Sequence, residues 1–313
     1  MRAWVARRLD GPGAIELIET GVPEPAAGQV RIKVGAAAVN PVDLAVSSGM
    51  LVKLGLTAPR QQFGLGWDVA GTVDAVGPAN AGAAVMQAKV GDAVVGVADL
   101  LAQTLKTHSD YVILNADAIA RAPKGIEPKQ AATFGLNGLT ALQAVKKIHG
   151  ETVFVTGAAG GVGGYAVELA KHLGKTVIAS AAAADEALVR HLGADHFVDR
   201  NEDLSAAVRQ IAPAGVDGVV DAAVVGIGAQ EAMRTGGYHV HLQGGPKPPQ
   251  LRGITVEQLF IHVNHAELDE LARLVEQNVI STRVAETYHL NEAPQAYKRL
   301  AEGGVRGRLV LVI

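Results

Sequence analysis

The segment from residue 157 to residue 164 carries the clearest chemistry in the sequence. An apolar stretch leads into a turn in which Ala158, Gly160 and Gly163 have the spacing of a dinucleotide-binding fingerprint. Gly160 would let the backbone approach a pyrophosphate, and Gly163 would let the following helix pack closely on the strand. The N-terminus of that helix offers free N–H groups and a partial positive charge to phosphates. The segment therefore predicts a site for a nicotinamide dinucleotide.

The end of the next predicted strand decides which nicotinamide is favoured. Ser180 stands where NAD enzymes place an acidic residue that binds the ribose 2′-hydroxyl, and four alanines follow it. Without that carboxylate, nothing here repels a 2′-phosphate. Residues 181–187 contain no basic side chain, whereas Arg200 could reach the phosphate and Arg190 is less favoured. We expect NADP(H), with a modest preference over NAD(H).

Strands and helices alternate around this turn. Each predicted helix closes on a glycine, as a left-handed C-terminal cap requires. Such alternation predicts an α/β domain with a doubly wound parallel sheet. The expected strands cover residues 152–156, 176–180, 196–198, 218–221 and 238–243, with helices ending near residues 173–174 and 191–193.

The first third of the chain has a different pattern. Val30, Ile32 and Val34 alternate with polar residues, which is typical of a half-buried strand. Further strands are expected at 69–76 and 93–97, separated by glycine turns, so we predict a small, mostly antiparallel β domain. Beyond it, the sequence predicts a helix that begins with Pro128, a capping box at Asn264 and Glu267 opening a helix to Val275, and a last strand at 308–313.

The composition excludes several classes of protein. The chain has 313 residues, 49% of them hydrophobic and 19% charged, which suits two globular domains. A net charge of −3 without basic blocks favours neither nucleic acid nor a membrane surface as partner. The absence of cysteine excludes disulfides, iron–sulfur clusters and thiolate zinc sites. No signal peptide or membrane span is predicted, so we expect a soluble cytoplasmic protein.

Several motifs together resemble the zinc-free quinone oxidoreductase branch of the medium-chain dehydrogenase/reductase superfamily. The resemblance implies a GroES-like catalytic domain (residues 1–122 and 264–313), a Rossmann domain (residues 123–263) and a homodimer paired through a strand at residues 259–263. The matching motifs are Asn-Pro-Val-Asp at 40–43, Gly-Trp-Asp-Val-Ala-Gly at 66–71, Val-Gly-Asp at 90–92, Gly-Leu-Thr-Ala at 138–141, the 158–163 turn, Leu-Gly-Ala-Asp at 192–195 and Arg-Gly-Arg-Leu-Val at 306–310.

The same resemblance assigns roles to individual residues. Asn40 would contact the nicotinamide region, although an Asn before Pro also forms turns. Asp43 would be either catalytic or an acid at a helix N-terminus, and Trp67 would be a wall of the substrate pocket. The implied cofactor-binding residues are Asn40, Pro41, Thr140, Ala159, Gly160, Gly161, Val162, Gly163, Ser180, Arg200, Ala222, Ala223, Gly244, Phe260 and His262.

No metal is expected. Zinc alcohol dehydrogenases of the superfamily carry a histidine ligand where this chain has Trp67. His239 and His241 would share one face of a strand, but no third ligand lies nearby in sequence, so we interpret them as a packed pair. We therefore expect no bound zinc and no effect of chelators on activity.

Without a metal to polarise an oxygen, the suitable hydride acceptor is already electron-poor. A quinone and an α,β-unsaturated carbonyl both qualify. Many relatives have a tyrosine at the position of Leu51, and no other acid/base pair is evident, which favours quinones. Two alternatives stay open: a dedicated enoyl reductase of a biosynthetic pathway, and a dinucleotide-binding sensor or structural protein without useful turnover.

Overall fold

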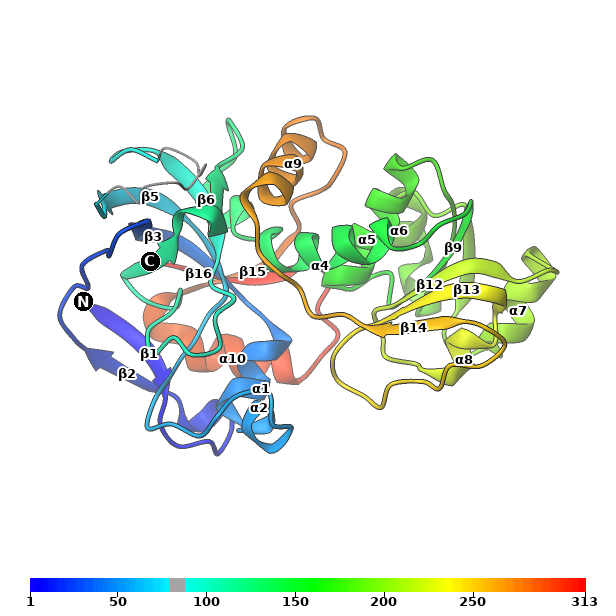
Figure 1. Cartoon of the computed structure of the whole chain (residues 1–313), viewed down its shortest axis with the longest axis horizontal. Helices are drawn as coiled ribbons and strands as arrows, with labels where there is room; N and C mark the ends of the chain where they lie inside the picture. The colour runs from blue at the N-terminus through cyan, green and yellow to red at the C-terminus, as the bar shows by residue number, and fades with distance from the viewer. Residues whose placement is uncertain (79–87) are drawn as a thin grey trace. The chain divides into compact units, whose positions relative to one another are not determined.

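The computed structural model describes residues 1–78 and 88–313, which group into two compact units (Figure 1). The first unit comprises Met1–Leu136, His262–Glu276 and Thr282–Ile313, and the second comprises Asn137–Ile261 and Gln277–Ser281. Residues 123–136 thus group with the first unit by contact, whereas the sequence assigned them to the second domain. The boundaries of the functional domains, 1–122 with 264–313 and 123–263, stay a prediction.

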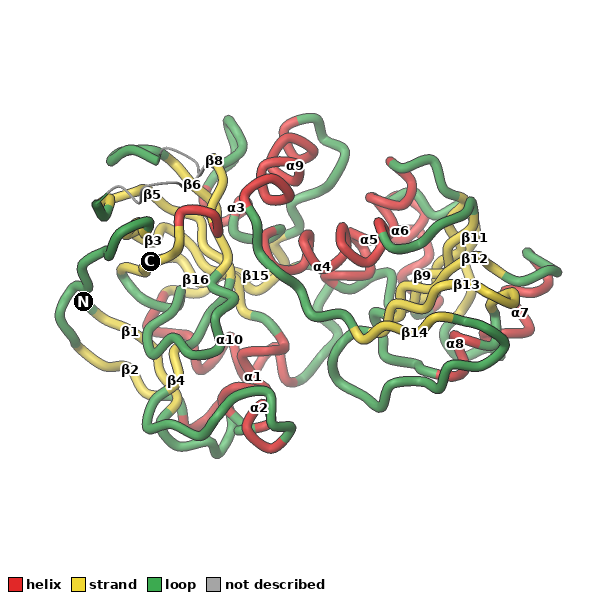
Figure 2. Tube along the Cα trace, in the orientation of Figure 1, coloured by secondary structure: helices red, strands yellow, loops and turns green. Residues whose placement is uncertain are grey.

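The second unit is built on a six-stranded parallel sheet with the order β11-β10-β9-β12-β13-β14. The chain moves outward from β9 in one direction and then returns to add strands on the other side, which confirms the doubly wound sheet. Figure 2 shows these strands side by side. The strands are β9 Thr152–Thr156, β10 Thr176–Ala181, β11 His196–Asp199, β12 Val216–Asp221, β13 Met233–His241 and β14 Thr255–Gln258.

The helices of the second unit end where the glycines predict. Gly174 and Gly193 have φ angles of +76° and +109°, which are left-handed values that favour glycine. The helices are α5 Gly161–His172, α6 Glu186–His191, α7 Leu204–Ile211 and α8 Ile227–Gln230, and α4 Gly135–Lys146 spans the division between the two units.

One predicted strand is wrong. Residues 259–263 form no strand; the edge strand is β14, which pairs with β13 up to the partners Gln258 and His241. The Leu259 N–H still donates to the His241 carbonyl at 2.9 Å, but β13 ends at that residue. The chain therefore has no further partner strand and leaves the sheet. In a dimer, the edge strand available for pairing would therefore be β14 and not residues 259–263. The dimer itself stays a prediction.

The first unit is mostly antiparallel, as the sequence predicts. One sheet has the order β15-β16-β3-β5-β6-β8, with β7 also paired to β3, and a smaller sheet has the order β2-β1-β4. Among the strand pairs of the described residues of this unit, only β15 and β16 are parallel. The strands are β1 Arg2–Ala6, β2 Glu16–Glu19, β3 Gln29–Val39, β4 Phe63–Gly64, β5 Asp68–Val76, β6 Ala93–Val97, β7 Tyr111–Asn115, β8 Ile119–Arg121, β15 Val284–His289 and β16 Arg308–Val312.

Local signals in this unit are confirmed. Val30, Ile32 and Val34 are buried on β3, and Pro128 is the first residue of a helix. The Asn264 side chain accepts from the Glu267 N–H at 2.9 Å and opens the predicted helix. The helices are α1 Pro41–Ser47, α2 Met50–Lys53, α3 Pro128–Ala131, α9 His265–Glu276 and α10 Ala293–Ala301.

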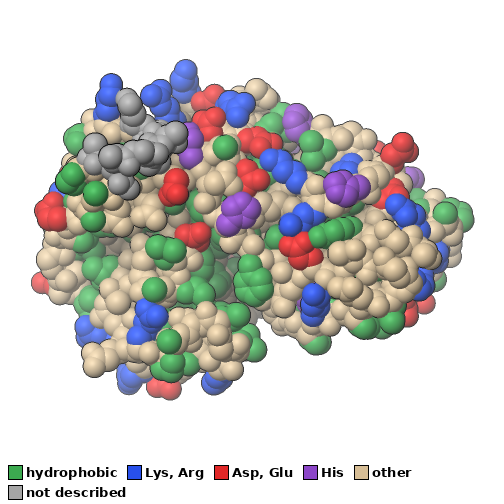
Figure 3. All heavy atoms as spheres, in the orientation of Figure 1, with side chains coloured by type: hydrophobic (Ala, Val, Ile, Leu, Met, Phe, Trp, Pro, Cys, Tyr) green, Lys and Arg blue, Asp and Glu red, His purple; other side chains and the backbone are tan. Residues whose placement is uncertain are grey.

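The surface carries no dominant charge on the side that Figure 3 displays, where acidic and basic side chains are interspersed. None of the helices in residues 1–78 and 88–313 has the length and apolar character needed to cross a bilayer.

Candidate functional site

The glycine turn joins β9 to α5 in a tightly hydrogen-bonded loop. Gly157 has a φ angle of +63°, and its carbonyl accepts from the Gly160 N–H at 2.9 Å. The Ala158 N–H donates to the Ser180 carbonyl of the neighbouring strand at 3.0 Å. The turn is thus fixed to both strands, and the first turn of α5 presents its N-terminal N–H groups at the sheet edge.

Gly160 and Gly163 are needed for different reasons. A Cβ on Gly163 would lie 2.2 Å from the Gly157 carbonyl oxygen and 2.7 Å from its carbon, so only glycine fits there without a shift. A Cβ on Gly160 would meet only the Gly157 oxygen, at 3.1 Å, and its φ of −79° suits any residue. Apart from this one tight contact and the adjacent residues of the chain, nothing in the described residues lies within 4 Å of that Cβ position, which leaves space for a ligand, as a pyrophosphate contact requires.

The predicted cofactor residues of the second unit gather along one edge of its sheet. In doubly wound sheets, ligands bind outside the carboxyl ends of the strands where the strand order reverses, which is here between β9 and β12. Apart from Thr140 in α4, they all lie at or beyond the carboxyl ends of strands: Ala159, Gly160, Gly161, Val162 and Gly163 after β9, Ser180 in the end of β10, Arg200 after β11, Ala222 and Ala223 after β12, Gly244 after β13 and Phe260 after β14. Asn40, Pro41 and His262 belong to the first unit. Their part in cofactor binding stays a prediction.

The loop that would hold a 2′-phosphate contains the expected groups. The Ser180 side chain is buried, and the Arg200 side chain is exposed just beyond β11. Arg190 pairs with Glu186 at 2.8 Å on α6, and its lower rank as a phosphate ligand stays a prediction.

The first unit contains a buried polar cluster at the start of α1. The Asn40 amide donates to Asp68 Oδ2 at 2.9 Å, and its oxygen accepts from Arg308 Nη2 at 2.6 Å. Arg308 also lies 3.3 Å from Asp68, and both side chains are almost fully buried. Burial raises the pKa of Asp68, and Arg308, Asn40 and the Leu136 N–H only partly offset this effect. Asn40 therefore bridges a buried ion pair as well as preceding Pro41.

Asp43 links α1 to the segment that carries Trp67. One of its oxygens accepts from the Asn40 N–H and the other from the Gly66 N–H, both at 2.8 Å. Gly66 has a φ of +94°, and a Cβ there would lie 2.3 Å from the Thr107 hydroxyl. These contacts are those of a positioning residue at a helix N-terminus, which is one of the two roles considered for Asp43.

Lys106 was missed by the sequence analysis. Its ammonium nitrogen lies 3.3 Å from the centre of the Trp67 ring, and its side chain is buried. Burial lowers the pKa of Lys106 to about 7, although Asp43 and Asp99 act in the opposite direction. Such a lysine exchanges a proton near neutral pH. No sequence signal connects it with Trp67, because the contact depends on how the segment that follows β6 folds back.

The neighbouring histidine is held in its neutral form. His108 Nδ1 lies 2.9 Å from the Tyr297 hydroxyl and Nε2 lies 3.2 Å from the Ala38 carbonyl. Burial lowers the pKa of His108 and raises that of Tyr297 well above its usual value. Among these buried groups, Lys106 is the one suited to donate a proton.

Comparison with known proteins places this arrangement in a family. Residues 26–141 match the alcohol dehydrogenase GroES-like domain, and residues 192–311 match the zinc-binding dehydrogenase domain. The chain belongs to the medium-chain dehydrogenase/reductase superfamily, in its quinone oxidoreductase-like branch.

The similarity to individual relatives extends over most of this reductase. It is 27% identical to a chloroplast envelope quinone oxidoreductase homolog of Arabidopsis thaliana, over 96% of this chain and 94% of that protein. It is 34% identical to an NADPH-dependent alkenal/one oxidoreductase of the same plant, over 80% of this chain and 65% of that protein. A mycobacterial protein solved in complex with NADPH superimposes with a TM-score of 0.86 at 27% identity and full coverage of both chains.

The geometry of the glycine turn predicts that valine at Gly160 and valine at Gly163 both weaken NADPH binding, but that they affect stability differently. Gly160→Val should weaken NADPH binding at least about tenfold, which is about 1.4 kcal/mol, and leave the thermal midpoint of the cofactor-free protein near wild type. Gly163→Val should also lower that midpoint, because overpacking commonly costs ~1–3 kcal/mol. Fluorescence titration and thermal unfolding without cofactor measure both effects. Wild-type NADPH binding by Gly160→Val would show that this turn does not hold the cofactor.

The buried ion pair gives a stability prediction. Arg308→Leu leaves Asp68 buried without its cation, which should lower the free energy of unfolding by about 3–5 kcal/mol. Arg273→Leu is the matched control, because Arg273 and its partner Asp269 have side chains 62% and 41% exposed. The control should change stability by less than about 1 kcal/mol. Denaturant unfolding of both variants tests this, and equal effects would show that the buried pair is not structurally important.

Proposed function

We propose that this protein is an NADPH-dependent reductase that transfers hydride to a quinone or an α,β-unsaturated carbonyl without a metal at the reacting oxygen. The observation that carries the proposal is the open turn at Gly160, at the point where the strand order of a doubly wound sheet reverses. Two relatives named as a quinone oxidoreductase homolog and an NADPH-dependent alkenal/one oxidoreductase support the acceptor class and the cofactor.

The residues of the turn fit a dinucleotide. The N–H groups at the start of α5 would bind the pyrophosphate, and the space beside Gly160 would admit it. Ser180 and Arg200 would receive the 2′-phosphate, because Ser180 places no charge there and Arg200 is exposed on the next strand end. The bound cofactor supplies a hydride from its nicotinamide ring.

The two acceptor classes differ in their need for a proton. Hydride addition to an enone leaves an enolate whose α-carbon must be protonated, whereas a hydroquinone anion takes its proton readily from water. We propose Lys106 as the proton donor to the enolate, with Trp67 as a wall that keeps the amine desolvated. The Nζ–Trp67 distance of 3.3 Å and the burial of Lys106 support this role. The reaction then converts the ammonium group to a neutral amine, which regains its proton from solvent.

Turnover separates this proposal from the alternatives. Rapid NADPH oxidation with 1,4-quinones and small enones is expected. Tight NADPH binding without turnover on a broad panel of acceptors would instead indicate a sensor or structural protein. Turnover confined to long enoyl thioesters would indicate a dedicated enoyl reductase.

Cofactor choice gives a specific prediction. The unmodified protein should bind NADPH more tightly than NADH, and Ser180→Asp should reverse the preference. Two like charges ~4 Å apart near a protein surface repel by up to about 4 kcal/mol. Ser180→Ala is the control, since it removes the hydroxyl without adding charge. Fluorescence titration with both cofactors measures the ratio, and equal or tighter NADH binding by the unmodified protein would contradict our interpretation of this loop.

Lys106 gives a prediction that separates the two acceptors. Lys106→Met keeps the length of the side chain and removes the acid, so enone turnover should fall by about 10²–10⁴-fold while quinone turnover changes little. In the unmodified enzyme, enone turnover should decline as pH rises through about 7, because the amine is then neutral. The charges facing this amine are Asp43, Asp99 and, when protonated, His108.

Lys106→Met should not show this decline of enone turnover with rising pH. Lys53→Met is the control, because Lys53 is an exposed lysine of the same unit. Equal losses on enone and quinone in Lys106→Met would show that Lys106 supports the fold or the pocket rather than proton transfer.

A further inference from the structure

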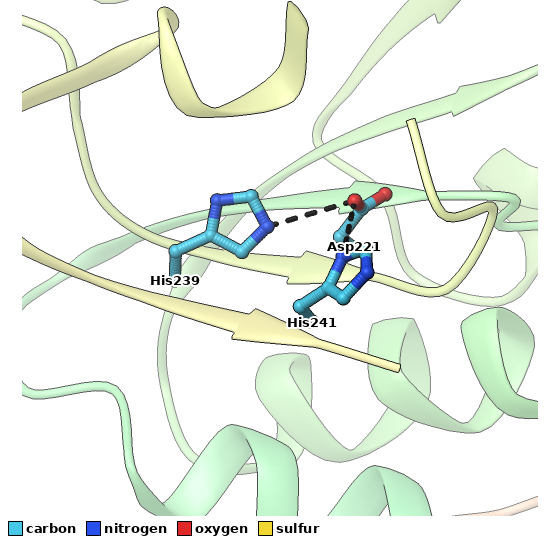
Figure 4. Close-up of side chains that lie close together, drawn as sticks. All are labelled: Asp221, His239 and His241. Atoms are coloured by element: carbon cyan, nitrogen blue, oxygen red, sulfur yellow. Dashed lines mark hydrogen bonds and ion pairs between the residues drawn. The ribbon is translucent and has the colours of Figure 1, made fainter. Parts of the chain in front are cut away.

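A cluster of two histidines and one aspartate lies at the carboxyl edge of the sheet in the second unit. Asp221 is the last residue of β12, and His239 and His241 lie two residues apart on β13, so both face one side of the sheet. Asp221 is in register with His241. All three side chains are fully buried, and Figure 4 shows both rings pointing toward the Asp221 carboxylate. The structure thus supplies the third group that the sequence did not reveal.

His239 is the anomalous member of the cluster. It shares its row across the sheet with the apolar residues Phe154, Val219 and Val256. Its Nδ1 is buried without a partner, and its Nε2 faces only the Asp221 carboxylate, whose Oδ2 lies 3.5 Å away. A buried polar group without a partner destabilises the folded state, so such groups are rare and require an explanation. A neutral imidazole whose Nε2 faces a carboxylate at this distance is suited to bind a cation.

The distances suit a metal ion. His239 Nε2 lies 3.5 Å and His241 Nδ1 lies 3.2 Å from the same oxygen, Asp221 Oδ2. One ligand atom from each residue lies within 4.8 Å of the others. Ligands bound tetrahedrally to zinc at about 2.0–2.1 Å are ~3.3 Å apart, which the two measured separations bracket.

Surrounding groups hold the ligands in place. Asp221 Oδ1 accepts from the Thr156 hydroxyl at 2.7 Å and from the Val225 N–H at 2.9 Å, and Oδ2 accepts from the Gly226 N–H at 2.7 Å. His241 Nε2 lies 3.4 Å from the Gly245 carbonyl, which is the outer partner that metal-binding histidines usually have. Burial raises the pKa of Asp221, but the contacts from the His239 side chain, the Gly226 N–H, the Thr156 hydroxyl and the Val225 N–H outweigh it and hold the pKa at about 2. The carboxylate is therefore ionised.

We propose that Asp221, His239 and His241 bind one divalent transition-metal ion, with zinc as the ion that two imidazoles and a carboxylate suit best. The ion has a structural role, because its ligands are buried, and a water molecule completes its coordination. This proposal replaces the expectation that the chain binds no zinc; it leaves untouched the expectation that no metal takes part in hydride transfer.

Metal titration of the untagged, chelator-treated full chain tests the site. Calorimetry with Zn²⁺ should show one equivalent per chain, and Co²⁺ should develop the visible absorption of a four-coordinate ion. His239→Leu should lose the Co²⁺ absorption and weaken Zn²⁺ binding at least about 100-fold. His172→Leu, which removes an exposed histidine of the same unit, should bind both ions like the wild type.

Thermal unfolding provides a second readout. Without metal, His239→Leu should unfold at a higher temperature than the wild type, because leucine suits its apolar row and leaves no polar atom unpaired. With excess Zn²⁺, only the wild type and His172→Leu should gain stability. Absence of Zn²⁺ binding by the wild type, or wild-type binding by His239→Leu, would overturn the proposal and leave a buried Asp–His cluster.

Discussion

The architecture of the second unit depends on one close approach between backbone segments. The first turn of α5 passes so near the Gly157 carbonyl that a single additional carbon at Gly163 would lie 2.2 Å from its oxygen. This contact sets α5 against the end of β9 and aims the helix N-terminus along the carboxyl edge of the sheet. Every functional claim about this edge assumes that geometry, because a displaced helix would neither present its N–H groups nor leave space beside Gly160.

The first unit depends on a different constraint, because several of its charged side chains are buried and need partners. Asp68 and Arg308 are removed from water, and Asn40 bridges them with both polar atoms of its amide. Asp43 is equally buried and is satisfied by two backbone N–H groups. These contacts fix the segment that carries Trp67. Lys106 lies against the Trp67 ring, where burial lowers its pKa and the charges of Asp43 and Asp99 partly offset that effect.

The sequence predicted the features that depend on local patterns. The glycine turn, the strand at 152–156 and the alternation on β3 follow from spacing and backbone freedom, and the structure confirms them. Features that depend on register between distant segments could not be predicted. Asp221 and His241 are partners only because β12 and β13 pair in one register, so the histidines seemed to lack a third ligand. The strand expected at 259–263 was misplaced for a related reason, since β13 ends too early to pair with it.

The proposed reaction depends on the direct transfer of hydride from NADPH to an electron-poor carbon. The most direct test is a single turnover of an enone with NADPH carrying deuterium at one face of nicotinamide C4, using each of the two labelled isomers. Direct transfer predicts that one isomer, and only one, delivers its deuterium to the β-carbon of the product, with a primary isotope effect on that step. If NADP⁺ formed but neither isomer delivered deuterium to the product, direct hydride transfer would be contradicted.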